Sequence, residues 1–239
     1  MIEMHNVSKV FRTDTIETHA LKRFHVSVEP GEFVAVTGPS GSGKTTFLNV
    51  AGLLEEFTAG RYILDGEDVS RLTDNERSHI RNEKLGFVFQ SFNLIPDLDL
   101  YDNVDVPLRY RKMPAPERRR RITTALETVG LAARMKHVPA HLSGGQQQRA
   151  AIARAIAGDP RVILADEPTG NLDTTMSEQI MELLEEINAR GTTVIMVTHN
   201  LDLARRARRH IEIIDGEIAG TAARPVGAAA ARPSIFPAA

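Results

Sequence analysis

A glycine-rich run with one lysine and two threonines spans residues 38–46 and follows the apolar residues 33–36. Glycines at this spacing let successive backbone N–H groups curl around a phosphate chain, and the N-terminus of the next helix adds its dipole. Lys44 then reaches the outer phosphates, and the Thr45 hydroxyl holds Mg²⁺. A chance glycine loop is the alternative, which the strand-like and helix-like flanks disfavour. We expect a nucleoside triphosphate to bind at Gly38, Ser40, Gly41, Ser42, Gly43, Lys44, Thr45 and Thr46.

Three further apolar runs end in side chains that act on phosphate, metal or water. Gln90 follows residues 85–89, Asp166 and Glu167 follow 162–165, and His199 closely follows 192–197. Ligands of a parallel α/β sheet bind at the carboxyl ends of its strands. Each side chain alone has a plain explanation, such as a strand-end turn, a solvated carboxylate or a partly buried histidine. Their joint position behind the glycine-rich loop predicts one shared site.

The chemistry of each side chain suggests its role in that site. Asp166 is suited to Mg²⁺ held largely through water, and Gln90 can bind the same ion through its carbonyl oxygen or accept from water. Glu167 is the candidate to polarise an attacking water molecule. His199 can donate to the terminal phosphate and stabilise the charge that develops there.

A second anion-binding pattern, Leu-Ser-Gly-Gly-Gln, occupies residues 142–146 at the start of a predicted helix. A serine and two glycines at a helix N-terminus can bind a phosphate. The alternative is a helix cap, because Ser143 and Gln146 have capping-box spacing. A cap alone needs Ser143 but not both glycines.

The elements that position these residues alternate between strand and helix, which predicts an α/β fold. Strands are expected at 1–7, 20–28, 61–65, 85–89, 162–165, 192–197 and 211–214. Helices are expected from 45, 73, 99, 116, 143, 174 and 200 onward. Residues 91–158 form a mostly helical insertion. Residues 220–239 are rich in Ala, Pro and Arg without periodicity, and we expect that tail to be disordered.

Composition narrows the class of protein. The chain has 239 residues, of which 42% are hydrophobic and 25% charged, as in a soluble globular protein. It has no cysteine, which excludes disulfides, zinc–thiolate sites and thiol catalysis. A net charge of −2 gives no reason to expect nucleic-acid binding. The N-terminus lacks a signal-peptide pattern, and the apolar runs are too short to span a bilayer, so we expect a cytoplasmic protein.

These motifs, in this order, resemble those of the ATP-binding cassette (ABC) ATPases, and the likeness covers about residues 1–218. The matching segments are 38–46 (Walker A), Gln90 (Q-loop), 142–146 (signature), 162–167 (Walker B and its adjacent glutamate), 171–173 (D-loop) and His199 (H-loop). The resemblance implies a P-loop NTPase core with an N-terminal antiparallel β-subdomain and a helical insertion that carries the signature motif. The ATPase domain would span residues 1–219.

The resemblance also implies roles that the residues alone do not. The signature loop of one subunit closes over ATP held by another, so Ser143, Gly144, Gly145 and Gln146 would contact ATP in trans. Asp173 would couple the two sites of a homodimer. Phe11 matches the aromatic that stacks on adenine, a position more often occupied by tyrosine; as an alternative, Phe11 belongs to the core.

Within that family the sequence is most similar to the macrolide-exporter, lipoprotein-releasing and cell-division branch. This similarity implies an integral membrane partner, a position on the inner face of the cell membrane, and coupling of ATP hydrolysis to export, extraction or mechanotransmission. Residues 91–110 would form much of the groove that receives the partner. A regulatory clamp, whose hydrolysis only resets its partner, is the alternative. A soluble cassette acting on DNA or ribosomes, a kinase and a GTPase fit the motifs less well.

Arginines gather at 118–121 and at 205, 206, 208 and 209. Solvated helix faces are the plain interpretation of both clusters. Contact with anionic lipid headgroups is the sharper one.

Overall fold

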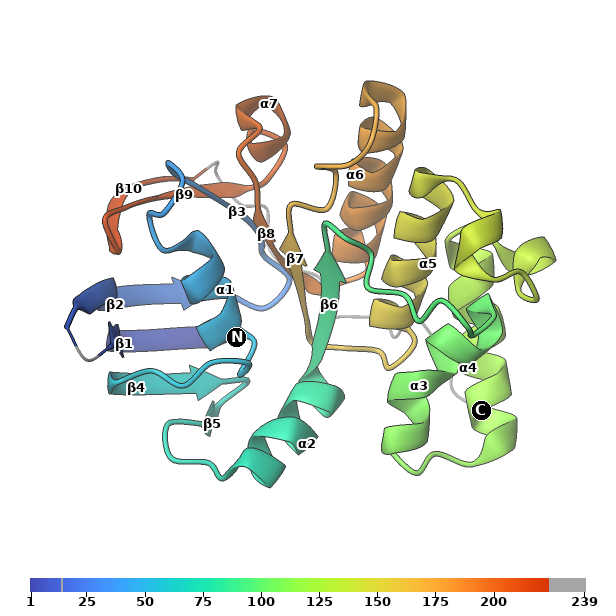
Figure 1. The fold of residues 1–239 in the computed structure, drawn as a ribbon, viewed down its shortest axis with the longest axis horizontal. Helices are drawn as coiled ribbons and strands as arrows, with labels where there is room; N and C mark the ends of the chain where they lie inside the picture. Colours follow the sequence, from blue (N-terminus) through green and yellow to red (C-terminus); the bar gives the residue numbers. More distant parts are fainter. Residues whose placement is uncertain (14, 224–239) are drawn as a thin grey trace.

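Two β-sheets form the framework of residues 1–13 and 15–223, the part of the chain that the computed structural model describes (Figure 1). The N-terminal sheet is antiparallel, with the strand order β2-β1-β4-β5. Its strands are β1 (Ile2–Arg12), β2 (Glu17–Val28), β4 (Ala59–Leu64) and β5 (Glu67–Asp68). This sheet is the predicted N-terminal β-subdomain.

The central sheet has the strand order β10-β9-β3-β8-β7-β6. Its strands from β9 to β6 run parallel, and β10 pairs antiparallel with β9. They are β3 (Phe33–Thr37), β6 (Leu85–Phe89), β7 (Val162–Asp166), β8 (Thr193–Val197), β9 (Arg209–Ile214) and β10 (Glu217–Ala223). Strands β3, β7 and β8 are apolar and almost wholly buried, as expected of a parallel sheet covered on both faces.

The helices lie on both faces of this sheet. They are α1 (Lys44–Ala51), α2 (Asp74–Lys84), α3 (Leu100–Tyr110), α4 (Ala115–Thr128), α5 (Gly144–Ile156), α6 (Thr174–Ala189) and α7 (Leu201–Ala204), with short 3₁₀ turns at Ala132–Arg134 and Pro139–His141. Helices α3, α4 and α5 form a group on the far side of β6 from the antiparallel sheet (Figure 1). This group is the predicted helical insertion.

Several predicted helix starts are confirmed by side-chain caps. Thr73 and Glu76 form a capping box at α2. Asp99 accepts from the backbone at the start of α3. Asn200 does the same at α7, where its side chain accepts from Asp202 and Leu203.

Two apolar clusters hold the layers together, one on each face of the central sheet. The first joins the antiparallel sheet and α1 to one face, with Phe24 and Phe47 in ring contact, their centroids 5.0 Å apart. The second packs α3, α4, α5 and α6 on the other face. Because burial of apolar surface is the main stabilising contribution to folding, these clusters fix the strand ends relative to the glycine-rich loop at residues 38–46, called the phosphate loop below.

The C-terminal boundary differs from the prediction. The expected tail began at residue 220, but β10 continues to Ala223 because it pairs with β9, from Glu217 opposite Ile214 to Ala223 opposite Arg209. The predicted disorder of 224–239 concerns residues outside the described part. No helix among the described residues has the length and apolar character needed to span a membrane.

Candidate functional site

The carboxyl ends of four parallel strands meet at one edge of the central sheet. Asp166 pairs in register with Phe89 on β6 and with Val197 on β8, and Val197 also pairs with Val36 on β3. Beyond the strands, the backbone N–H of Glu167 donates to Val197, at 3.0 Å. The structure thus brings the predicted strand-end residues to the edge where the phosphate loop begins.

The phosphate loop has a backbone shape that requires glycine. Gly38 has φ +145°, and a Cβ there would lie 2.0 Å from the carbonyl oxygen of Ile213. Gly43 caps helix α1 with φ +104°, and its Cβ would lie 2.4 Å from the carbonyl oxygen of Ala20. The loop therefore lies tightly between β2 and β9, and it tolerates no side chain at these two positions.

Lys44 is folded back over its own loop. Its Nζ donates to the carbonyl oxygens of Gly38 and Pro39, at 2.9 and 2.7 Å. The Oγ of Ser42 is buried and has no hydrogen-bond partner among the described residues. A cation beside an unpaired hydroxyl, at the start of a helix, is suited to hold an anion.

A cavity of about 410 Å³ opens beside this loop. Its lining includes Phe11, Gly41, Gly43, Lys44, Thr45 and Thr46. Gly38, Ser40 and Ser42 complete the loop without lining the cavity. Phe11 is 41% exposed, and the Nζ of Lys9 lies 4.6 Å from the centroid of its ring, over the ring face. Phe11 therefore lines this cavity and is not part of the core.

Glu167 and His199 form a pair at the ends of β7 and β8. The Nδ1 of His199 lies 2.9 Å from Oε1 of Glu167. The second carboxylate oxygen of Glu167, Oε2, is buried and has no hydrogen-bond partner among residues 1–13 and 15–223. Glu167 adopts φ +46°, a conformation that non-glycine residues rarely take and that is found at functional sites.

Asp166 is half-buried beside the phosphate loop. Burial raises the pKa of its carboxyl group, the neighbouring Glu167 raises it further, and Lys44 lowers it. No group of three or more His, Cys, Asp or Glu side chains that could hold a metal occurs in the described part of the chain. Mg²⁺ does not need such a group, because it binds through one or two protein oxygens plus the phosphates of a nucleotide. The carboxylate of Asp166 and the hydroxyl of Thr45 are oxygen donors of that kind.

Gln90 makes contacts that its sequence position did not predict. Its Nε2 donates to Oδ1 of Asn171 at 3.1 Å, and Nδ2 of Asn171 donates to the backbone oxygen of Gln90 at 3.0 Å. A Cβ on Gly170 would lie 2.8 Å from the same Nε2. These contacts join the loop after β6 to the loop after β7. The sequence analysis had singled out Asn171 as part of the segment 171–173, but nothing in the sequence indicated that Gln90 contacts it.

The loop at residues 143–146 does not line the cavity beside the phosphate loop. Ser143 and Gln146 form the predicted capping box: Ser143 N donates to Oε1 of Gln146 at 3.1 Å, and Gln146 N donates to Oγ of Ser143 at 3.4 Å. Gly145 has a packing reason, because its Cβ would lie 2.8 Å from the sulfur of Met176.

Asp173 and Gly144 both lie beside Leu172, the first in the chain and the second in space. Asp173 caps α6, accepting from the N–H of Met176 at 2.9 Å. A Cβ on Gly144 would make ordinary contact with Leu172, at 3.5 Å. The signature loop and the loop that ends in Asp173 therefore lie next to each other.

The arginine clusters are engaged in ion pairs within the chain. Arg118 pairs with the buried Asp105, at 2.8 Å. Arg120 and Arg121 both pair with Glu117. In the second cluster, Arg206 pairs with Glu185. The first cluster lies on helix α4, as expected of a helix face, but Arg118, Arg120 and Arg121 are engaged in ion pairs. The second cluster is not a helix face, because α7 ends at Ala204 and Arg209 begins strand β9.

Comparison with known proteins gives consistent matches. A family model described as ABC transporter matches residues 21–170. The uncharacterized ABC transporter ATP-binding protein YvrO of Bacillus subtilis is 48% identical over 218 residues, covering 91% of this chain and 95% of that protein. The macrolide export ATP-binding/permease protein MacB of Brucella melitensis is 47% identical over 218 residues, which cover 91% of this chain but 34% of MacB.

Among solved structures, the ATP-binding cassette MJ0796, in a dimeric post-hydrolysis state bound to ADP and Pi, superposes with a TM-score of 0.87. It is 43% identical in sequence, and the match covers 95% of this chain and all of that one. A second dimeric structure of MJ0796, described as a bacterial ABC transporter cassette, gives the same TM-score at 44% identity and 95% coverage.

Proposed function

The chain belongs to the ABC transporter family as an ATP-hydrolysing subunit, and from this premise we propose that it couples ATP-driven closure of a homodimer to work on an integral membrane partner. One observation carries the proposal: Lys44 lines the cavity beside its loop, and the loop that starts at Ser143 contributes no residue to the lining of that cavity. In the proposal each of these two phosphate-binding loops is half of a site, and a second, head-to-tail copy completes it. The dimeric state of the similar MJ0796 cassette supports this arrangement.

In this proposal the phosphate loop and Lys44 bind the phosphates of ATP, while Phe11 stacks on the base. Thr45, Asp166 and Gln90 would hold Mg²⁺, which would neutralise charge on the phosphate oxygens.

Hydrolysis follows from the Glu167–His199 pair. Glu167 accepts a proton from the attacking water through Oε2, its unpartnered oxygen, because His199 engages Oε1. His199 orients that carboxylate and donates to the terminal phosphate.

The dimer contact uses the loops that follow the 3₁₀ turn Pro139–His141 and strand β7. Ser143, Gly144, Gly145 and Gln146 contact the terminal phosphate bound by the other copy. Asp173 lies beside this loop and links the two sites. Strands β1–β10 with α1, α2, α6 and α7 form the ATPase core, and residues 91–158 form the helical subdomain.

An apolar groove of about 540 Å³ between α2, β6, α3 and α5 is the surface we assign to the membrane partner. Two large apolar side chains on it reach solvent: Tyr110 is 78% exposed and Leu54 is 47% exposed. Exposed apolar patches of this kind mark interaction sites. The MacB relatives are ATP-binding/permease proteins by name, and we propose that a permease partner holds this chain at the cytoplasmic face of the membrane.

The test is a detergent pull-down of the tagged full chain from its source membranes, with ATP turnover measured before and after. We expect an integral membrane protein to co-purify and to change the rate of phosphate release. An active ATPase that captures no membrane protein would contradict the proposed coupling. If Glu167→Gln with ATP alone restored the partner's activity in membranes, a regulatory clamp would replace the proposal.

A further inference from the structure

The groove assigned to the membrane partner carries positive charge without negative charge. Arg81, Arg111 and Arg154 all line it, and no described residue in its lining is Asp or Glu. The remaining lining is mainly apolar and includes Leu54, Phe87 and Tyr110. The lining of this apolar groove therefore has a net positive charge, which favours an occupant that carries negative charge.

None of the three arginines forms an ion pair with a carboxylate in the described chain. Arg81 donates to the carbonyl oxygen of Leu53 at 2.8 Å and to the hydroxyl of Ser78 at 3.0 Å. Arg154 donates to the carbonyl oxygens of Asn93 and Phe92, the latter at 2.9 Å. These partners are neutral, and Arg154 has no carboxylate partner among the described residues. Arg81 also lines a polar pocket beside the groove together with Glu55, Glu56 and Asp74, which lie outside the groove lining.

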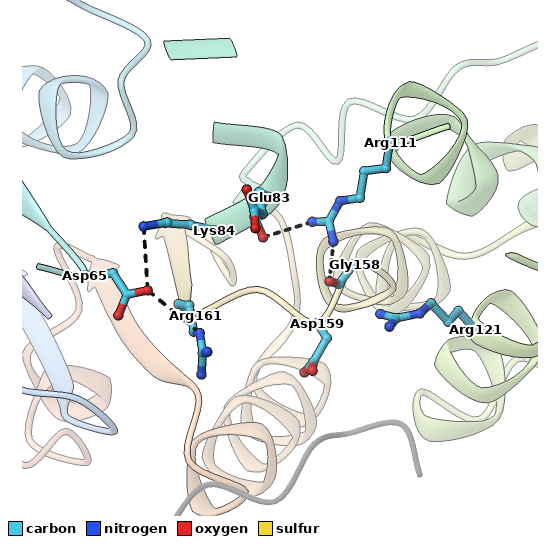
Figure 2. A pocket seen from close by; sticks show the side chains of 8 residues that line it. All are labelled: Asp65, Glu83, Lys84, Arg111, Arg121, Gly158, Asp159 and Arg161. Atoms are coloured by element: carbon cyan, nitrogen blue, oxygen red, sulfur yellow. Dashed lines mark hydrogen bonds and ion pairs between the residues drawn. The ribbon is translucent and has the colours of Figure 1, made fainter. Parts of the chain in front are cut away.

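Arg111 lines both the groove and a second, polar pocket of about 480 Å³, which Figure 2 shows. It donates to the carbonyl oxygens of Gly158 and Glu83, at 2.6 and 3.1 Å. The acidic side chains Asp65, Glu83 and Asp159 line that second pocket, where Asp65 is shared by Lys84 and Arg161. These three acids therefore line the second pocket and not the groove.

Arg81 and Arg154 also have N–H groups beyond those in the hydrogen bonds described above. A guanidinium has five N–H donors, and Arg81 and Arg154 each make two of the hydrogen bonds described above. Burial lowers the pKa of Arg111 and of Arg154, which is the direction for cations that lack a neutralising partner. A carboxylate placed in the groove would supply that partner and a charge-assisted hydrogen bond.

We propose that the segment of the membrane partner that occupies this groove is apolar along one face and carries at least one carboxylate, which pairs with Arg81 or Arg154. The proposal rests on the assignment of the groove to a membrane partner. It deepens that assignment by naming the chemistry of the occupant. The apolar side chains of the segment pack on Leu54, Phe87 and Tyr110, while the carboxylate fixes its register.

The position of Arg154 gives this contact a consequence for the ATP site. Phe92 and Asn93, whose carbonyls Arg154 holds, have φ values of +60° and +50° and follow Gln90 closely in sequence. A carboxylate that binds Arg154 therefore contacts the side chain that holds Phe92 and Asn93 in place. These two residues belong to the loop that runs from Gln90 to the groove.

The experiment uses two synthetic amphipathic peptides with identical leucine and alanine positions and either glutamate or glutamine at two polar positions. Binding of each to the full chain is measured by fluorescence anisotropy at low salt. We expect the glutamate peptide to bind at least about tenfold more tightly, since a hydrogen bond to a charged group contributes that much. Arg81→Gln and Arg154→Gln should each reduce this preference, and the two together should abolish it.

The matched control is Arg205→Gln, because Arg205 is exposed on the surface after α7 and pairs with Asp202 outside the groove. It should leave the preference unchanged. Arg81 lies on the surface helix α2, so its variant remains informative if Arg154→Gln fails to fold. Equal binding of both peptides, or binding of neither, would overturn the inference about charge.

A photo-crosslinking amino acid in place of Tyr110 then identifies the natural segment in source membranes. Sequencing of the crosslinked peptide should show Asp or Glu among apolar residues. A membrane segment without an acid would overturn this inference and leave the proposed function intact. Absence of any membrane protein among the crosslinked products would count against both.

Discussion

The Nδ1 atom of His199 and the Oε1 atom of Glu167 lie 2.9 Å apart, and they join the ends of two adjacent parallel strands. His199 is largely exposed, with 72% of its side chain accessible, whereas 17% of the Glu167 side chain is accessible. The histidine thus approaches from the solvent side and engages one oxygen of the carboxylate. The other oxygen is buried and unpartnered in the described chain, which leaves one acceptor for a substrate water.

Replacement of that acceptor should separate binding from hydrolysis. Glu167→Gln keeps the shape of the side chain but removes the base, so phosphate release should fall by about 10²–10⁴-fold while ATP binding is retained. ATP should then trap the dimer, which size-exclusion chromatography with ATP measures. Glu186→Gln, at an exposed position on α6, is the matched control. Turnover near the wild-type rate in Glu167→Gln would exclude Glu167 as the base.

Lys44→Ala should weaken nucleotide binding itself. Its ammonium group is the cation that the loop holds beside the cavity, where it contacts the carbonyls of Gly38 and Pro39. Loss of a charged hydrogen-bond donor to phosphate should lower ATP affinity by about tenfold or more. Titration with a fluorescent ATP analogue measures the change, with Lys136→Ala, exposed and outside the cavity, as control. Normal affinity would contradict the assigned role of the loop.

Phe11→Ala should also weaken ATP binding, because it removes the ring that is proposed to stack on the adenine base. Stacking of a base on an aromatic ring contributes about 1–3 kcal/mol, which corresponds to about 5- to 150-fold in affinity. Phe11→Tyr retains the ring and should bind ATP as the wild type does. Calorimetric titration of both variants checks the prediction. Equal affinity of Phe11→Ala and wild type would assign Phe11 a role outside nucleotide binding.

The sequence predicts the order of elements and the strand-end chemistry because both have local causes. Apolar runs of strand length, followed by Asp166 or by the glycine-rich loop, identify parallel strands and their ligand-binding ends. The helix starts at Thr73 and Ser143 are equally local, since a capping box needs only residues three apart. These features were recoverable from spacing alone.

Contacts between distant segments had no such local cause. Gln90 and Asn171 are 81 residues apart, and their amide pair forms only when the loops after β6 and β7 come together. Gly145 illustrates the same limit: a Cβ there would press on the side chain of Met176, which comes from another helix. The strand character of residues 220–223 was missed because it comes from pairing with β9 and not from the composition of the segment.

Tyr62 links strand β4 to the end of helix α1, and its removal should affect stability and not catalysis. Its hydroxyl donates to the carbonyl oxygen of Ala51 at 2.7 Å, in a fully buried position. Tyr62→Phe leaves that carbonyl unpaired and should lower the free energy of unfolding by about 1 kcal/mol. Urea denaturation at neutral pH measures the loss, and ATP turnover of the folded variant should be unchanged.

The same residue predicts a dependence on pH. Burial raises the pKa of Tyr62 above its unfolded value of about 10, so its contribution to stability is complete below that pH and declines above it. The difference in unfolding free energy between wild type and Tyr62→Phe should therefore shrink as the pH rises beyond about 10. A difference that stays constant between neutral and alkaline pH would contradict the assignment.

Mixing two inactive variants should restore activity if each site is shared between copies. Lys44→Ala retains an intact loop at Ser143, and Ser143→Arg retains an intact Lys44. In a mixed dimer the intact halves meet at one site. Random pairing makes about half of the dimers mixed, each with one of its two sites whole, so the mixture should reach about a quarter of wild-type turnover.

The matched control mixes Lys44→Ala with Glu167→Gln. Both substitutions then damage the same half of the site, so neither composite site is whole and turnover should stay at the level of the parent variants. Phosphate release, measured over a series of mixing ratios, should peak at equal amounts for the first pair and remain flat for the second. Restoration in neither pair would place Ser143 outside the ATP site. Restoration in both would mean that Lys44 and Glu167 serve different sites.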